Sequence, residues 1–205
     1  MDMIVLIKEI IETIEKNENY LTELDRVIGD SDHGTNLLRG FNKIKEELPN
    51  LTGLNNAELF NKIAMLLISN VGGASGALYG TGILRMGNTM KDKSDLKIED
   101  WILALDAMIE GIKMRGKSNL EEKTMLDTII PAVETLKANK DDKDIKEIAL
   151  KVSKSAEDGM NSTKNMVATK GRASYLGERS IGHLDPGAVS SYLIIKTVCD
   201  IVGRK

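Results

Sequence analysis

A chain of 205 residues suits one hydrophobic core, and we expect a single domain over residues 1–205. The formal net charge of −3, with acidic and basic residues interleaved, argues against a nucleic-acid partner, which would need a basic face. Aromatic residues make up only 3% of the chain and Cys199 is its one cysteine, so an aliphatic, helix-favouring core without an internal disulfide is expected.

Apolar residues in the first half of the chain recur at three- and four-residue steps, a spacing typical of helices with one buried face. This face is interrupted near residues 17–19, and Pro49 is expected to end the second helix. The N-terminal segment carries Asp2, Lys8 and Glu9, which excludes a signal peptide or membrane span and predicts a cytoplasmic protein. The expected helices cover residues 4–24, about 36–48, about 55 to 72, and a segment that leaves the glycine-rich stretch 72–82 and ends near Met90.

The second half of the chain continues the helical spacing. Pro131 lies inside one expected helix, so a kink or a break is predicted there. The last helix has a clear start, because Asp185 can cap it and Pro186 fits the first helical position. The expected helices cover residues 98–114, 124–137, 145 to about 167, and 186–202.

The fold class follows from this pattern. No segment alternates polar and apolar residues between turn signals, so we predict an all-α protein of about eight helices without a sheet. Short connections favour antiparallel neighbours, and therefore an up-and-down bundle or a ring of helices. Three loops depart from the pattern because they gather glycine, acidic, basic and hydroxyl residues together with both histidines. These loops are the candidates for function.

The first loop covers residues 24–36 and reads LDRVIGDSDHGTN. Asp25, Asp30 and Asp32 supply three carboxylates, and hard cations prefer such oxygen ligands. The spacing does not match an EF-hand, whereas Mg²⁺ takes its remaining ligands from water and from the phosphates of a nucleotide. An Asx turn with an N-cap is the structural alternative for the same residues. The backbone N–H groups that can meet a phosphate at this helix start belong to Gly34, Thr35 and Asn36.

The second loop covers residues 71–82 and reads VGGASGALYGTG. Closely spaced glycines let the backbone approach a ligand, and Ser75 adds a hydroxyl at the start of a helix. Small residues also let two helices pack closely. The stretch by itself therefore fits a binding role and a packing role equally well.

The third loop covers residues 170–188, and a polar loop of this length favours a binding role or a lid over a mere connection. Arg172 and Arg179 are candidate ligands for phosphate. A histidine beside a helix cap more often makes structural hydrogen bonds, so we assign neither His33 nor His183 a catalytic role.

One apparent motif is rejected. Residues 111–118, GIKMRGKS, match the P-loop pattern, but a P-loop needs a buried strand before it and a helix after it. Here an amphipathic helix precedes the motif and a charged loop follows it. We therefore do not expect a P-loop.

Taken together, the three loops resemble one family. The stretches GDSDHGTN, GGASGALYG and GRASYLGERSIGHLDPGA are similar to those of the L subunit of dihydroxyacetone kinase and of the C-terminal nucleotide domain of single-chain dihydroxyacetone kinases. Their order is the family's order. The family usually carries glycine or alanine where this chain has Ser31, a small-residue change that keeps both neighbouring carboxylates.

The resemblance implies a barrel of eight antiparallel helices with ADP or ATP bound at one end. It also implies that Asp25, Asp30 and Asp32 hold two Mg²⁺ ions that bridge the phosphates, and it implies no catalytic residue in this chain. The residues that it assigns to the nucleotide are His33, Gly34, Thr35, Asn36, Ala74 and Ser75 on the phosphate side, Gly116 and Met125 near the adenine, and Arg172, Asp185, Pro186 and Gly187 closing the site.

The resemblance also implies partners. The chain ends where the family's nucleotide domain ends, so dihydroxyacetone is expected on a separate K subunit. A phosphohistidine on an M subunit would rephosphorylate the bound ADP, and the γ-phosphoryl group would pass to dihydroxyacetone. This is the phosphotransferase-system form of the enzyme, in which the nucleotide resembles a coenzyme.

Two alternatives remain open at this point, and a third is disfavoured. The chain can use exchangeable ATP with a separate sugar-binding partner, as the single-chain kinases do. It can act as a nucleotide-binding adaptor of a transcription regulator, because the motif residues would look the same. A helical Mg²⁺-dependent pyrophosphohydrolase is disfavoured, since the spacing of Glu9, Glu12 and Glu15 is that of a solvated helix face.

Overall fold

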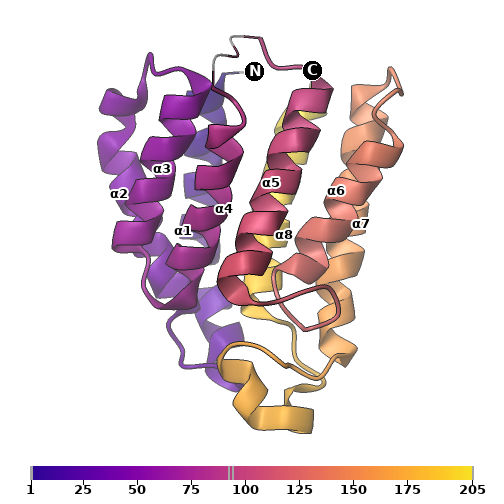
Figure 1. Ribbon diagram of the computed structural model, residues 1–205. Coiled ribbons are helices and arrows are strands. Elements are labelled where there is room, and N and C mark those ends of the chain that lie inside the picture. The colour runs from indigo at the N-terminus through magenta and orange to yellow at the C-terminus, as the bar shows by residue number, and fades with distance from the viewer. Residues whose placement is uncertain (1, 92, 94, 205) are drawn as a thin grey trace.

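The computed structural model describes residues 2–91, 93 and 95–204. Within these ranges the chain forms eight α-helices and two 3₁₀ helices and no strand, which confirms the predicted all-α class (Figure 1). The elements are α1 (Met3–Ile28), α2 (His33–Leu51), α3 (Asn56–Asn70), α4 (Gly73–Asn88), α5 (Ile98–Gly116), α6 (Leu126–Ala138), α7 (Ile145–Ser162), η1 (Thr163–Asn165), η2 (Arg172–Ser180) and α8 (Pro186–Val202).

The helices form a closed antiparallel ring. Each α-helix packs on the next one along the chain, and α8 packs on both α7 and α1, which closes the barrel. In Figure 1, α1 begins and α8 ends at the upper end of the barrel, whereas η2 and the loops before α2, α4, α6 and α8 lie at the lower end. The antiparallel order therefore places the N-termini of α2, α4, α6 and α8 at one end.

The core runs along the barrel axis. Its main apolar cluster takes residues from all eight α-helices, and Ile14 and Leu21 of α1 are completely buried in it. Burying such a side chain stabilises the fold by about 1.5–3 kcal/mol. A smaller cluster at Met86, Met90 and Ala104 is covered by an edge-to-face pair of aromatic rings, Phe60 and Trp101.

Two sequence predictions about the ends of α2 are wrong. The helix begins at His33 and not near Asn36, because the turn that carries the acidic residues ends directly at Asp32. It also continues through Pro49 to Leu51. A proline in the last turn of a helix removes only one backbone hydrogen bond, and burial of the Leu51 side chain at 1% exposure anchors this turn to the core.

The predicted end of α7 near residue 167 is also wrong. The helix stops at Ser162, where the Ser162 hydroxyl donates to the Gly159 carbonyl and the Thr163 hydroxyl donates to the Met160 carbonyl. Hydroxyl side chains that bond to preceding carbonyls in this way compete with the helical ladder. A 3₁₀ turn over Thr163–Asn165 then leads out of the barrel.

Neither predicted interruption breaks a helix. The helix α1 is continuous through residues 17–19, where Gly34 of α2 lies so close that an added Cβ would be 2.1 Å from the Glu18 carbonyl oxygen. The helix α6 is continuous through Pro131. Pro131 withholds a hydrogen bond from the Asp127 carbonyl, and Gly159 of α7 packs against that carbonyl.

Two further expectations are confirmed. Cys199 is a buried free thiol, and burial raises its pKa to about 11. The GIKMRGKS stretch covers the end of α5, its C-cap Lys117 and the following Ser118, and it follows no strand in the described residues, so the rejected P-loop is absent. Among the described helices, none combines the length and the apolar character needed to cross a membrane.

Candidate metal and anion site

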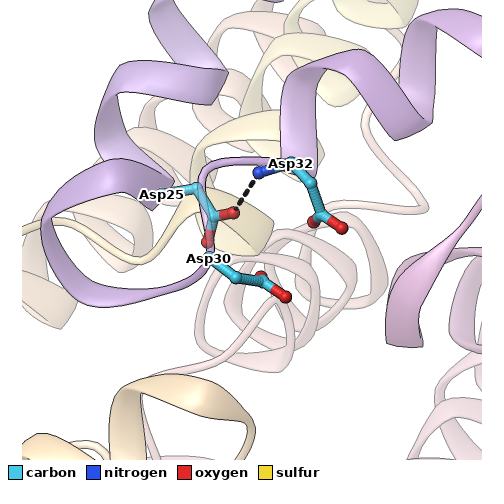
Figure 2. Close-up of side chains that lie close together, drawn as sticks. All are labelled: Asp25, Asp30 and Asp32. Atoms are coloured by element: carbon cyan, nitrogen blue, oxygen red, sulfur yellow. Dashed lines mark hydrogen bonds between the residues drawn. The ribbon is translucent and has the colours of Figure 1, made fainter.

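Three aspartates converge at the lower end of the barrel. Asp25 lies in the last turn of α1, and Asp30 and Asp32 lie in the turn that leads into α2 (Figure 2). One carboxylate oxygen from each lies within 4.8 Å of the others, so the structure brings together all three predicted metal ligands. Three oxygen ligands at this spacing fit a hard cation such as Mg²⁺.

The hydrogen bonds of this turn favour the metal interpretation over a capping role for Asp32. Asp32 occupies the N-cap position of α2, but its side chain accepts no capping hydrogen bond. Asp25 supplies that acceptor instead, because its Oδ2 accepts the backbone N–H groups of Asp32 at 2.9 Å and His33 at 3.1 Å. The Asp25 carboxylate is therefore fixed in orientation, and the Asp32 carboxylate is left without a capping hydrogen bond.

The backbone of the turn explains its small residues. An added Cβ at Gly29 would lie 1.9 Å from Oδ1 of Asp25, so a side chain there would displace the carboxylate. Ser31 has a φ of 63°, in the left-handed region that glycine adopts at least cost. The geometry of the acidic cluster thus depends on both positions.

His33 lies next to the aspartates and connects three helices. Its Nδ1 is 3.1 Å from the Ser75 hydroxyl of α4, and its Nε2 is 2.9 Å from the Ser190 hydroxyl of α8. Tyr79 extends this buried network by hydrogen bonds of 2.8 Å to Ser190 and Ser191. Burial lowers the pKa of His33, although the charges of Asp25 and Asp32 act in the opposite direction. With both ring nitrogens engaged, His33 has the geometry of a structural residue.

The same contacts show that the even-numbered helices begin side by side. His33 joins the start of α2 to that of α4, where Gly72 packs on the Asn36 side chain, and to the first turns of α8. Gly187 of α8 lies next to Met125, the residue before α6, with an added Cβ 3.7 Å from the Met125 nitrogen. Each helix N-terminus carries unpaired N–H groups and about half a positive charge. At α6 and α8 some of these groups are already paired, Leu126 N–H with the Thr124 hydroxyl and Ala188 N–H with Asp185. The starts of α2 and α4 beside the three carboxylates suit an anion bound through cations.

The structure shows a packing role for part of the glycine-rich stretch, and its binding role stays a prediction. Gly72 and Gly73 lie at the start of α4 beside Asn36, with Gly73 at a φ of 64°. Gly76 and Gly80 instead allow close packing on α3, since an added Cβ would lie 2.3 Å from the Val71 carbonyl oxygen and from Ile68, respectively. Ala74 is exposed and Ser75 is half-buried at the start of the helix.

The third loop reaches the aspartates through Arg172. Its Nε lies 2.7 Å from Oδ2 of Asp30, and both side chains remain partly exposed. An ion pair of this kind adds only about 0–1 kcal/mol to stability. Its main effect is to place a guanidinium beside the acidic cluster. Arg179 and His183, the other candidates of this loop, are exposed to solvent.

Asp185, Pro186 and Gly187 form the start of α8. Asp185 caps the helix as predicted, accepting the Ala188 N–H at 2.7 Å, and Pro186 occupies the first helical position. Desolvation raises the pKa of Asp185 to about 7, although the Ala188 N–H and the Lys123 charge act in the opposite direction. Gly116 ends α5 next to Leu78 of α4, on another side of this end of the barrel.

Sequence reasoning missed Lys123 and the partners of His33. Lys123 is 1% exposed, and its Nζ donates to the carbonyls of Thr163 and His183 at 2.5 Å each. Desolvation lowers its pKa, whereas the nearby Asp185 and Asp127 raise it. Its sequence context, a run of charged residues, is typical of a solvated loop and gave no signal. The pair Ser190-Ser191, which follows a predicted cap inside an apolar helix, was a signal that could have been used.

Comparison with known proteins agrees with this geometry. The DAK2 domain profile matches residues 27–200. The chain belongs to the DAK2 domain family.

The chain is also similar to bacterial kinase subunits. The chain is 43% identical to the ADP-binding subunit DhaL of PEP-dependent dihydroxyacetone kinase 1 from Listeria innocua, over 89% of this chain and 87% of the relative. It is 44% identical to the ADP-binding subunit DhaL of the PEP-dependent dihydroxyacetone kinase from Escherichia coli, over 83% of this chain and 82% of the relative. The corresponding subunit of the PTS-dependent enzyme from Lactococcus lactis is 41% identical over 93% of this chain and 92% of its own length.

A solved structure shares the family fold. The dihydroxyacetone kinase of C. freundii, crystallised in complex with AMP-PNP and Mg²⁺, superposes with a TM-score of 0.75 at 23% sequence identity. The match covers 97% of this chain but 33% of that kinase, so the chain spans about a third of the longer enzyme. This likeness confirms the predicted helical barrel.

Proposed function

We propose that the chain is the ADP-binding L subunit of a phosphoenolpyruvate-dependent dihydroxyacetone kinase. The observation that carries the proposal is the convergence of Asp25, Asp30 and Asp32 at the end of the barrel where α2, α4, α6 and α8 begin. The relatives that are 41–44% identical over most of the chain, all named as ADP-binding subunits, support the same role.

The donor set fits Mg²⁺. We propose that the three aspartates hold two ions, whose four positive charges would offset the three carboxylates and a nucleotide polyphosphate. When bound, Mg²⁺ supplies charge neutralisation and orientation for phosphoryl transfer. Asp25 is held in position by the backbone of Asp32 and His33, so part of the ligand set is preorganised.

The remaining residues position the nucleotide. The first turns of α2 and α4, with Ser75 and residues 33–36, would donate hydrogen bonds to the phosphates. Gly116 and Met125 would lie near the adenine, and Arg172 with Asp185, Pro186 and Gly187 would close the site. Phosphoryl transfer needs positioning and charge neutralisation more than covalent protein chemistry, so the chain requires no catalytic base of its own.

The partners supply the reacting groups. The chain would hold its nucleotide while a phosphohistidine-carrying M subunit donates a phosphoryl group and a K subunit presents dihydroxyacetone as the acceptor. Retention of the nucleotide through successive cycles is the property that this arrangement requires, which sets it apart from a kinase that exchanges ATP.

The test begins with the nucleotide content of the purified protein. We expect about one ADP per chain to survive dialysis in Mg²⁺, and Asp30→Ala to lower that content by at least about tenfold because a metal ligand is lost. Asp141→Ala, an exposed aspartate in the turn between α6 and α7, is the matched control. Unchanged ADP content in Asp30→Ala would contradict the site.

Reconstitution tests the activity. With K and M subunits and phosphoenolpyruvate, we expect dihydroxyacetone phosphate to form at catalytic amounts of bound ADP. Activity that requires added, freely exchanging ATP would point to direct use of ATP. No product in the complete system would instead leave a nucleotide-binding adaptor as the better explanation.

A further inference from the structure

Two loops at the nucleotide end of the barrel are tied to each other. The first, residues 117–125, connects α5 to α6, and the second, residues 163–185, connects α7 to α8. The second loop is closed at its base, where the Gly182 N–H donates to the Lys164 carbonyl at 2.7 Å and the Asp185 N–H donates to the Thr163 hydroxyl at 3.1 Å. It therefore has the form of a compact loop whose two ends lie together.

Lys123 lies at this junction. Its ammonium group donates to Thr163 and His183, one carbonyl from each end of the 163–185 loop. The neighbouring residue adds a second tie, because the Glu122 carbonyl accepts the Thr169 N–H at 3.4 Å and its carboxylate lies 3.3 Å from Lys170 Nζ. Glu122 and Lys123 of the 117–125 loop thus contact both ends of the 163–185 loop and a segment between them.

This arrangement is costly for a purely structural contact. A lysine is almost never fully buried, and its ammonium loses much hydration when it is. Lys123 also has a φ of 59°, a left-handed conformation that is unfavourable for a residue with a side chain. An apolar side chain would fill the same space with less desolvation. Strained backbone and a buried charge together indicate a functional constraint.

The loop that Lys123 holds also contacts the acidic cluster. The 163–185 loop carries Arg172, whose guanidinium lies 2.7 Å from Asp30. Arg172 itself is exposed, and the loop around it rests on Ile28 of α1 through Ala168, Ala173 and Leu176. The position of Arg172 thus depends on this small apolar contact together with the way the base of the loop is fixed. We propose that Lys123 is a positioning residue that fastens the 163–185 loop to the 117–125 loop and so holds Arg172 over the three aspartates.

The first test does not depend on a nucleotide. In Lys123→Met, amide hydrogen exchange measured by mass spectrometry should become about tenfold or more faster in residues 163–185, since hydrogen bonds from a charged group are lost. Exchange in α3 should stay unchanged. Lys123→Arg, which keeps a charged donor, should restore most of the protection. Lys117→Met is the matched control, because Lys117 belongs to the same loop and also has a positive φ but is exposed.

The second test rests on the proposed nucleotide site. Mg²⁺–ADP binding, measured by calorimetry, should weaken about tenfold in Lys123→Met and in Arg172→Ala, as expected for the loss of a charged hydrogen bond. The double variant should bind nearly as well as Arg172→Ala alone, because Lys123 acts through the position of Arg172. A merely structural lysine would give additive losses.

The inference would be overturned by unchanged amide hydrogen exchange in the 163–185 loop of Lys123→Met, or by additive losses of Mg²⁺–ADP affinity in the double variant. It would also be overturned by a general loss of helical circular dichroism in Lys123→Met while Lys123→Arg folds. The last result would assign Lys123 to the stability of the whole barrel. A wild-type protein that binds no Mg²⁺–ADP would refute the proposed function instead. The hydrogen-exchange experiment would still show whether Lys123 fastens the two loops together.

Discussion

Asp185 links the capping of α8 to the electrostatics of the site. Its carboxylate accepts the Ala188 N–H, and burial raises its pKa to about 7 from an ordinary value of 3.8. The folded protein therefore holds a proton on Asp185 over a pH range in which the unfolded chain has released it. Stability from this group is present below about pH 4 and is lost as the pH rises toward 7.

This shift predicts the pH dependence of stability. In EDTA, the free energy of unfolding of the wild-type protein should contain a component that falls between about pH 4 and 7, and Asp185→Asn should remove that component while keeping an acceptor for Ala188. Urea unfolding at several pH values measures it. Asp144→Asn, which changes the exposed cap of α7, is the matched control. An identical slope in wild type and Asp185→Asn would show that this carboxyl is ionised in the fold.

At the scale of elements, close packing of α6 and α7 depends on one glycine. Gly159 is buried in α7, and an added Cβ would lie 2.2 Å from the Asp127 carbonyl oxygen and 3.2 Å from its carbon. The atoms that such a Cβ would meet belong to the backbone of Asp127, which cannot rotate away as a side chain could. Asp127 also accepts the backbone N–H groups of Glu121 and Thr124, so movement of this turn would disturb the loop between α5 and α6.

We predict that Gly159→Ala destabilises the protein. Alanine in a helix interior would normally stabilise by about 1 kcal/mol relative to glycine, but overpacking against backbone costs about 1–3 kcal/mol. The clash should prevail, and chemical unfolding should show a net loss of about 1–2 kcal/mol. Asp158→Ala, an exposed change in the same turn of α7, should stay within about 0.5 kcal/mol of wild type. A more stable Gly159→Ala protein would show that the two helices can separate freely.

For the whole molecule, the proposed binding site lies at the end of the barrel where α2, α4, α6 and α8 begin. A ligand at this site would bind only the folded barrel, because the groups come from α1, α2, α4 and α8. Binding to the native state alone raises the free energy of unfolding by mass action, by about 2.7 kcal/mol at a ligand concentration of one hundred times Kd.

We therefore predict a strong, metal-dependent thermal shift. Protein freed of nucleotide should melt at a higher temperature with Mg²⁺ and ADP together than with either alone, and EDTA should abolish the increase. Differential scanning calorimetry provides the measurement, with Asp32→Asn as the variant that should lose the response. An increase in melting temperature with ADP that persists in EDTA would show that the nucleotide binds without a metal ion held by the aspartates.

Much of this molecule was predictable from local sequence. The period of the apolar residues gave eight helices, and Asp185 with Pro186 marked the start of α8 correctly, because caps and helical faces depend on residues close in the chain. The errors at Pro49 and after Ser162 arose where packing of Leu51 or hydroxyl bonds to carbonyls outweighed propensity. The residues of the three loops were named, but their roles followed from a family resemblance.

What the sequence determined by itself was an all-helical chain with three polar loops and one set of clustered aspartates. Only the tertiary structure showed that the starts of α2, α4, α6 and α8 lie at one end and that His33 joins three of those helices through Ser75 and Ser190. It also showed that Lys123 of the 117–125 loop is buried against the 163–185 loop. These relations join residues up to 157 positions apart. They arise from how the helices close into a ring, which no local periodicity can specify.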